Sequence, residues 1–312
     1  MLRAQKLLAP LVLVALCVQL LLATAARSEA PSAAVDANPA TVSTAPRAAD
    51  AAPIRVAALL PWVAEAVAAA GDQAALVAGV RRSLHEPLPA GLVDLGNPHS
   101  PSLERLVEID PDLVVADRAI HARLTPQIEK LGAKVLLLGT DSVAETLASL
   151  DALSAAIGRP APLEARIAEV RAGIVALADR SNASVVALFG APGSFYVLTE
   201  RAWLGDLARH VGLDLAIAAT GDERLPGLVA VSDEAMAMAN PDLVLLVAHG
   251  DPARIRADLE RRTAAGGAWS GLAGARLGIH VLDPNLFSAN PGLEIVRAAE
   301  ALVALAPAGP ET

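Results

Sequence analysis

The chain has little cysteine, few aromatic residues and no concentrated positive charge. Its single cysteine, Cys17, lies in an apolar N-terminal run, so removal of that run would leave a protein without thiols. Cysteine catalysis and cysteine-type zinc sites would then be excluded. The formal net charge of −9 and the lack of a basic block argue against a nucleic-acid partner, which needs a basic face to neutralise phosphates.

Only three Trp, one Tyr and three Phe are present, although 54% of the 312 residues are hydrophobic. Alanine and leucine must therefore fill the cores, and the length suits two domains of roughly 100–200 residues each. The sequence contains no Gly-x-Ser-x-Gly, no phosphate loop and no dinucleotide fingerprint. It therefore gives little support for an enzyme.

The first 25 residues have the features of a secretory signal peptide. Two basic residues precede the apolar run 7–22, and Ala23–Ala25 has the small-x-small pattern of a cleavage site. Lipidation is disfavoured because Leu16, and not a small residue, precedes Cys17. We therefore expect residues 1–25 to be removed on export, the alternative being an uncleaved membrane anchor.

The rest of the chain divides into four segments. Residues 26–53 are rich in Ala, Pro, Ser and Thr, which predicts a disordered tether. From Ile54 onward, short apolar runs alternate with amphipathic stretches, which predicts parallel sheets covered by helices. Residues 161–180 carry apolar residues at steps of four and three, which predicts one long helix. This helix would connect an N-terminal α/β lobe (54–160) to a C-terminal α/β lobe (181–307).

The two predicted lobes contain a similar segment. Ser102–Glu104 is followed by Pro111-Asp112, and Ser232–Glu234 is followed at the same spacing by Pro241-Asp242. In each copy, a helix capped by serine ends before Pro-Asp, which starts a strand. The repetition predicts two lobes of similar build.

Further segments follow the order of a known family: Ala58–Pro61 with Glu65, Gly79-Val80, Gly96, Leu103–Arg105 before Pro111–Val114, and Trp269–Leu272 before His280–Asp283. In these segments the chain resembles the substrate-binding proteins of ABC importers for cobalamin, haem and iron-siderophores (class III). The resemblance covers roughly residues 54–306. The resemblance implies an α/β fold of two Rossmann-like lobes with mostly parallel sheets, joined by one long connector helix.

The resemblance also implies a function. The protein would be a periplasmic monomer that captures an iron-siderophore, haem or cobalamin between its lobes. It would deliver this ligand to an ABC permease dimer in the inner membrane, which works with an ATPase. No catalytic residue and no intrinsic cofactor are expected, and the transported ligand would contain Fe or Co. Many family members carry aromatic and acidic residues where Arg81–Pro87 stands here, which leaves the ligand open.

Four histidines lie near the ends of predicted strands. In open parallel sheets, ligands bind beyond the carboxyl ends of the strands. Imidazole ligates Zn, Cu, Fe and Ni, and it can be an axial ligand to haem iron. We predict ligand binding by His85, His99, His121 and His249, with His85, His121 and His249 as metal ligands. The alternatives are a bare transition-metal ion held by all four, or histidines that are only solvated or capping. His210 and His280 are expected to be structural.

The scarce aromatic residues suggest a second set of ligand contacts. Flat side chains at strand ends can stack on a macrocycle or a chelate. On this ground we predict ligand contacts for Trp62, Tyr196, Trp203 and Phe287, with ordinary packing under loops as the alternative.

Glu104 and Glu234 occupy matching places in the repeated segments. A carboxylate at a helix start complements the helix dipole, which is the simpler interpretation. The resemblance implies instead that each glutamate pairs with arginines of the permease. A periplasmic sensor built on the same fold is a further alternative to the importer.

Overall fold

The computed structural model describes residues 52–81, 88–217, 227–230 and 232–306. The predicted signal peptide, nearly all of the predicted tether and His85 lie outside these ranges. None of the helices in the described ranges has the length and apolar character that a membrane span requires.

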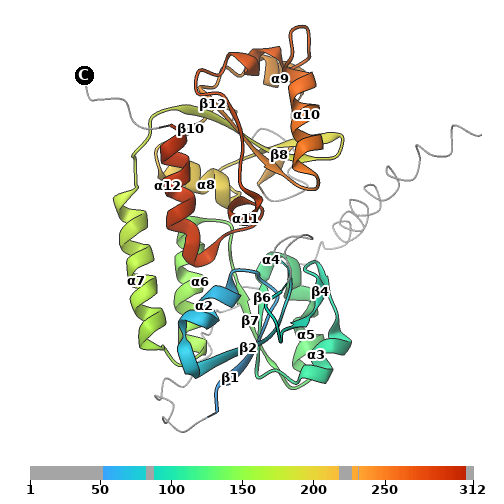
Figure 1. Cartoon of the computed structure of the whole chain (residues 1–312), viewed down its shortest axis with the longest axis vertical. Helices are drawn as coiled ribbons and strands as arrows, with labels where there is room; N and C mark the ends of the chain where they lie inside the picture. The colour runs from blue at the N-terminus through green and yellow to red at the C-terminus, as the bar shows by residue number, and fades with distance from the viewer. Residues whose placement is uncertain (1–51, 82–87, 218–226, 231, 307–312) are drawn as a thin grey trace, which may run out of the picture. The chain divides into compact units, whose positions relative to one another are not determined.

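The first lobe is built on a parallel sheet with the strand order β3-β2-β1-β6-β7 (Figure 1). Its strands are β1 (Ile54–Ala58), β2 (Ala74–Gly79), β3 (Val93–Asp94), β6 (Leu113–Asp117) and β7 (Lys134–Leu138). The segments between them form α2 (Val63–Ala69), η1 (Gly71–Gln73), the two-stranded ribbon of β4 (Gly96–Asn97) and β5 (Ser100–Pro101), α3 (Leu103–Ile109), α4 (Arg118–His121), η2 (Ala122–Leu124) and α5 (Thr125–Glu129). Helix α6 (Val143–Ala156) follows β7.

The second lobe has the strand order β11-β9-β8-β12-β13 (Figure 1). Its strands are β8 (Ser184–Ala191), β9 (Ser194–Leu198), β10 (Asp214–Leu215), β11 (Leu228–Val229), β12 (Leu243–Ala248) and β13 (Ile279–Val281). Strand β8 pairs in parallel with β10 and β12, and β12 pairs in parallel with β13. The pairs β8–β9 and β9–β11 are antiparallel. The helices are α8 (Trp203–His210), α9 (Asp233–Met238), α10 (Pro252–Thr263), η3 (Ser270–Gly274), α11 (Pro284–Phe287), η4 (Gly292–Glu294) and α12 (Ile295–Leu305). The predicted fold class, two α/β lobes, is confirmed.

Alternate side chains of each central strand point to opposite faces of the sheet and pack into two different cores. In β1, Val56 and Ala58 therefore enter one core, whereas Ala57 enters another. In β8, Val185 packs with the first of these cores, and Val186 packs into a third core under α10 and η3. Both faces of both sheets are covered, as expected for strands that are apolar throughout.

One hydrophobic core is shared by the two lobes. It joins the inner faces of β1 and β8 to side chains of α2, α6, α8 and α12 and of the connector helix α7 (Ala161–Ala176). Helix α7 lies beside both α6 and α12 (Figure 1). Its buried residues are Leu163, Ile167, Val170 and Ile174, at the predicted steps of four and three. The lobes are therefore connected by a packed helical layer and not only by the chain.

The connector differs in two respects from the sequence-based expectation. Helix α7 ends at Ala176 and not near residue 180, and Asp179 beyond it has a positive φ of 53°. Helix α6 was assigned to the first lobe, yet it packs against α7 and α8. The backbone N–H of Val143, at the start of α6, donates to the carboxylate of Asp206 in α8 at 2.7 Å. Tertiary contacts of this kind are not visible in local periodicity.

The repeated segments adopt equivalent structures in the two lobes. The hydroxyl groups of Ser102 and Ser232 cap α3 and α9 by accepting a backbone hydrogen bond three residues later. The carboxylate of Asp112 accepts from the N–H of Arg55 in β1 at 2.8 Å. In the same way, the carboxylate of Asp242 accepts from the N–H of Ser184 in β8 at 2.9 Å. Each Pro-Asp therefore ties the end of a helix to the central strand of its sheet.

Candidate functional site

Two of the predicted histidines directly follow strands or the helix after a strand, and a third is affected electrostatically by both. His121 ends α4 directly after β6, His249 follows β12, and His99 lies in the turn between β4 and β5. His121 and His249 act electrostatically on His99, although His249 comes from the other lobe. His85, the fourth member of the predicted set, lies outside the described residues.

The pKa of His99 is held below its ordinary value. Partial exclusion of water by the surrounding protein is the main cause, even though the residue itself is exposed. The neighbouring His121 and His249 lower this pKa further, and Asp117 opposes the shift. A lowered pKa keeps the imidazole neutral near pH 7, and the neutral form is the one that ligates metals.

His121 holds the backbone in place and has no ring nitrogen free for a metal. It is buried, and its Nδ1 accepts a hydrogen bond from the backbone N–H of Asp117 at 3.0 Å. This bond places the ring proton on Nε2, which donates to the carbonyl of Pro98 at 2.5 Å. Pro98 immediately precedes His99, so His121 fixes the turn that carries His99. The predicted role of His121 as a metal ligand does not fit this geometry.

His249 is exposed, and its ring stacks on Phe189 with the centroids 5.5 Å apart. Phe189 lies near the end of β8, and the sequence analysis did not single it out. Its position at the end of a central strand was a usable signal, because His249 follows the neighbouring strand β12. Among the described residues, no group of three or more His, Cys, Asp or Glu side chains could hold a metal ion.

Carboxylates surround the same end of the N-terminal sheet. Asp117 is buried and accepts hydrogen bonds from two backbone N–H groups of α4 and from the hydroxyl of Thr140. The pKa of Asp141 is raised by loss of hydration and then by the nearby charges of Asp117 and Glu145, while Arg118 opposes the shift. Arg118 is itself paired with Glu145. Buried and exposed carboxylates therefore lie at the same edge of the sheet as the imidazoles.

The predicted aromatic contacts are mostly taken up by packing. Trp62 is only 1% exposed and lies in the shared core, where Gly292 of η4 approaches its ring so closely that a Cβ there would come within 2.7 Å. Phe287 is buried and stacks on the half-buried Trp203 with centroids 6.1 Å apart. Tyr196 is half-buried in β9, opposite Phe189. Trp62 and Phe287 thus have no exposed ring face for a ligand in this structure.

The two histidines expected to be structural are bonded to backbone. His210 Nε2 lies 2.9 Å from the carbonyl of Ile174 in α7, and His280 Nε2 lies 2.7 Å from the carbonyl of Leu277. Glu104 and Glu234 are exposed in the first turns of α3 and α9. Their positions leave both carboxylates accessible to a partner.

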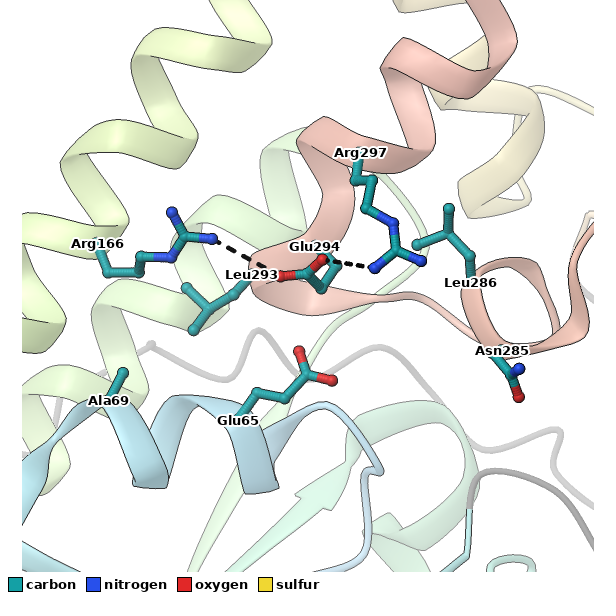
Figure 2. Close-up of a pocket in the computed structure, with 8 residues that line it drawn as sticks. All are labelled: Glu65, Ala69, Arg166, Asn285, Leu286, Leu293, Glu294 and Arg297. Carbon is teal, nitrogen blue, oxygen red and sulfur yellow. Dashed lines mark hydrogen bonds and ion pairs between the residues drawn. The ribbon is translucent and has the colours of Figure 1, made fainter. Parts of the chain in front are cut away.

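A pocket of about 420 Å³ lies away from the histidines, among α2, α7, η4 and α12 (Figure 2). At its centre, Glu294 pairs with Arg297 at 3.1 Å and lies 3.7 Å from Arg166 of the connector helix. None of the predicted ligand-binding residues lines this pocket. Its ion pairs link the connector helix to the C-terminal helix.

The two α/β lobes, the helical layer between them and the histidines at the strand ends define a two-lobed binding protein. The chain belongs to the periplasmic binding protein family, whose model matches residues 56–266. Among curated proteins it is similar to the high-affinity heme uptake system protein IsdE of Staphylococcus aureus, with 23% identity over 181 residues. This match covers 56% of the present chain and 61% of the length of IsdE.

Two solved structures share the fold. An ABC transporter substrate-binding protein from Listeria monocytogenes has a TM-score of 0.68 at 24% identity, and the match covers 81% of this chain and 98% of that one. S. aureus IsdE complexed with heme has the same TM-score at 18% identity, with the same coverage of both chains. The predicted family and the two-lobed architecture are thereby confirmed.

Proposed function

We propose that the chain is the substrate-binding component of an ABC importer and captures a metal chelate, with haem as the first candidate. It would act as a binding protein and not as an enzyme. The observation that carries this proposal is the placement of His249 directly after β12 and of His99 between β4 and β5, one imidazole in each lobe, with an electrostatic effect of His249 on His99. The role of S. aureus IsdE in heme uptake, and its structure complexed with heme, support the same class of ligand.

The imidazoles favour a macrocyclic ligand among the three chelates expected. A metal in a planar macrocycle keeps axial positions open, and histidine is a common axial ligand of haem iron. A ferric ion enclosed by a hexadentate siderophore has no open position for a protein nitrogen. Haem or cobalamin therefore suits His99 and His249 better than an iron-siderophore does.

Each side chain at the site would have a separate role. His99 and His249 would approach the metal from the two lobes. His121 would act as a positioning residue through its bond to the Pro98 carbonyl, in the way that outer groups orient metal ligands. Phe189 would support the ring of His249.

Absorption spectroscopy of the purified protein tests this role. Titration with haemin, cobalamin and a ferric siderophore in parallel should give a saturable spectral change with haemin. His99→Ala and His249→Ala should each convert a six-coordinate haem spectrum to a five-coordinate one. His280→Gln is the matched control, because that ring is bonded to backbone away from the strand ends. A haem spectrum that is unchanged in the double variant His99→Ala/His249→Ala would rule out axial ligation by this pair.

A bare transition-metal ion bound by histidines is the second candidate. Calorimetric titration with Zn²⁺ separates the two ligands. Tight Zn²⁺ binding that is abolished by His85→Ala, without haemin binding, would favour the bare ion. A sensor on the same fold would bind haem without supporting its uptake by cells.

The importer role also requires export and docking. We expect cleavage after Ala25 and a periplasmic protein, and mass spectrometry of the purified N-terminus checks this. Retention of Met1 in a membrane-bound product would contradict it. A lipidated Cys17 would instead make the protein a tethered lipoprotein.

For docking, Glu104 and Glu234 would each meet an arginine of the permease. Glu104→Arg or Glu234→Arg should reduce haem uptake while leaving haemin affinity unchanged, because both side chains are exposed and belong to helices that do not carry the histidines. A single exposed ion pair contributes only about 0.2–1 kcal/mol to binding, so removal of the charge alone would have a small effect. Arginine in place of glutamate would repel the arginine of the permease, and this makes charge reversal the more sensitive test. Loss of haemin affinity in either variant would place that glutamate in the ligand site.

A further inference from the structure

A chain of hydrogen bonds runs from the second lobe to the turn that carries His99. It begins at Asn290, which is 7% exposed and lies between α11 and η4. The side-chain amide donates to the Thr140 carbonyl at 2.9 Å and to the Thr146 hydroxyl at 2.7 Å. The amide oxygen accepts from the N–H of Gly292 at 2.9 Å. Because a carbonyl can only accept and an N–H can only donate, these partners fix the orientation of the side chain.

Thr140 joins this amide to the strand ends of the first lobe. It follows β7, and its hydroxyl donates to one carboxylate oxygen of Asp117 at 3.0 Å. The other carboxylate oxygen accepts from the N–H groups of Ala119 and Ile120, at 2.8 and 3.0 Å. These bonds cap α4, which spans only Arg118–His121 and is too short to be stable by its own hydrogen bonds. The position of α4 therefore depends on the Asp117 carboxylate.

The last residue of α4 holds the backbone directly before His99. The His121 ring accepts from the N–H of Asp117 at 3.0 Å and donates to the Pro98 carbonyl at 2.5 Å. Asp117 and His121 both act electrostatically on His99, so the capping carboxylate and the ring lie near it. A displacement of α4 would therefore displace the turn that carries His99.

We propose that Asn290 is a positioning residue of the ligand site, which holds the turn that carries His99 in place from the second lobe. This inference rests on the proposed capture of a metal chelate, and Asn290 acts through Thr140 and α4 without contacting the ligand. His249 follows β12 in the second lobe, so this connection would set the separation of the two imidazoles. Axial ligation of a planar macrocycle from both sides needs a set spacing between the two nitrogens, and outer groups commonly orient metal ligands in this way.

Two substitutions break the chain of hydrogen bonds at separate links. Asn290→Asp keeps the shape of the side chain but places an oxygen against the Thr140 carbonyl, and Thr140→Val removes only the hydroxyl that meets Asp117. In the apoprotein, at a pH where histidine is neutral, NMR should show altered ring signals of His99 and His121 in both variants. With haemin, both variants should lose part of the six-coordinate spectrum. Their affinity should fall roughly 3- to 10-fold, less than the roughly 10- to 100-fold typical of groups bonded directly to a metal ligand. Thr140→Ser keeps the hydroxyl and should restore the ring signals and the spectrum.

Ser181→Ala is the matched control. The Ser181 hydroxyl is buried and donates to the Ala306 carbonyl at 2.5 Å, so its removal also costs one buried hydrogen bond but leaves the chain from Asn290 intact. Its ring signals and haem spectrum should match those of the wild type. Unchanged ring signals in Asn290→Asp and Thr140→Val, or equal changes in Ser181→Ala, would overturn the positioning role and leave the importer role intact. A wild-type protein that binds no haemin would instead contradict the proposed function, and the ring signals of the apoprotein distinguish the two failures.

Discussion

At the residue scale, the environment of His99 has a measurable consequence. Its pKa is lowered by loss of hydration and then by His121 and His249. His249→Gln removes one of these contributions, so the pKa of His99 should rise toward its ordinary value. Proton NMR titration of the ring signals in both proteins measures this. An unchanged His99 pKa would show that His249 does not approach it in solution.

The lowered pKa of His99 also determines whether the protein becomes more or less stable as the pH falls. The unfolded chain binds a proton at His99 at a higher pH than the folded protein does. The stability that His99 contributes is therefore present above its ordinary pKa and is lost as the pH falls from that value through the lowered pKa of the folded protein. Urea unfolding across this range should show a smaller pH dependence for His99→Gln than for the wild type. An identical pH dependence would contradict the shift.

The sequence predicted that His121 and His249 follow strands, and the structure has His121 after β6 and His249 after β12. It could not predict that both ring nitrogens of His121 are occupied. One partner, Pro98, lies 23 residues earlier in the chain. Trp62 was misjudged for the same reason. It follows β1, but its ring faces Gly292, whose contact depends on the packing of η4 against α2.

At the element scale, Gly173 is a contact point between helices. Glycine is a poor helix former, and here α12 packs directly against this glycine of the connector helix. A Cβ at Gly173 would lie 2.8 Å from a methyl carbon of Val296. Alanine would gain about 1 kcal/mol in helix propensity, but a valine in a helix is stiff at χ1 and cannot easily move away.

Gly173→Ala should therefore destabilise the protein by about 1–3 kcal/mol of overpacking, less the propensity gain. Removing the opposing methyl groups should relieve the contact, so Gly173→Ala/Val296→Ala should be more stable than the sum of the single effects predicts. Urea unfolding of the four proteins measures this coupling. Gly274→Ala is the control, because a Cβ there would meet no atom within 4 Å. Additive effects of the two substitutions would contradict the proposed contact.

Most elements could be predicted from the sequence because their periodicity and caps are local, as for α6 after Ser142 and α3 after Ser102. Strand β9 was not predicted. Tyr196 was predicted as a ligand contact at a strand end, but it lies within β9, which pairs with β8. The antiparallel hairpin interrupts the strand–helix alternation on which the prediction relied.

At the scale of the whole molecule, we expect little movement between the lobes on ligand binding. Asn290, near the end of the second lobe, donates to the Thr140 carbonyl at 2.9 Å and to the Thr146 hydroxyl at 2.7 Å. Helix α7 is continuous from Ala161 to Ala176, and no hinge of a few free residues interrupts it. X-ray scattering with and without haemin should give nearly equal radii of gyration.

The control for this experiment is Asn290→Ala, which removes the two bonds between segments and should permit a larger change. A large decrease in the wild-type radius on binding would identify a hinge and contradict the rigid connection. The sequence predicted the rigid helix but not Asn290, since its partners lie about 150 residues earlier in the chain.

The shared core has a consequence for how the protein unfolds. Separate lobes would melt independently, but here side chains of α2, α6, α7, α8 and α12 belong to one cluster with the inner faces of both sheets. Neither half can lose its packing without exposing apolar surface of the other. Scanning calorimetry should therefore show one cooperative transition with equal calorimetric and van't Hoff enthalpies. A fragment cut at the connector helix should aggregate, because it would expose the half of the cluster that its missing partner covers.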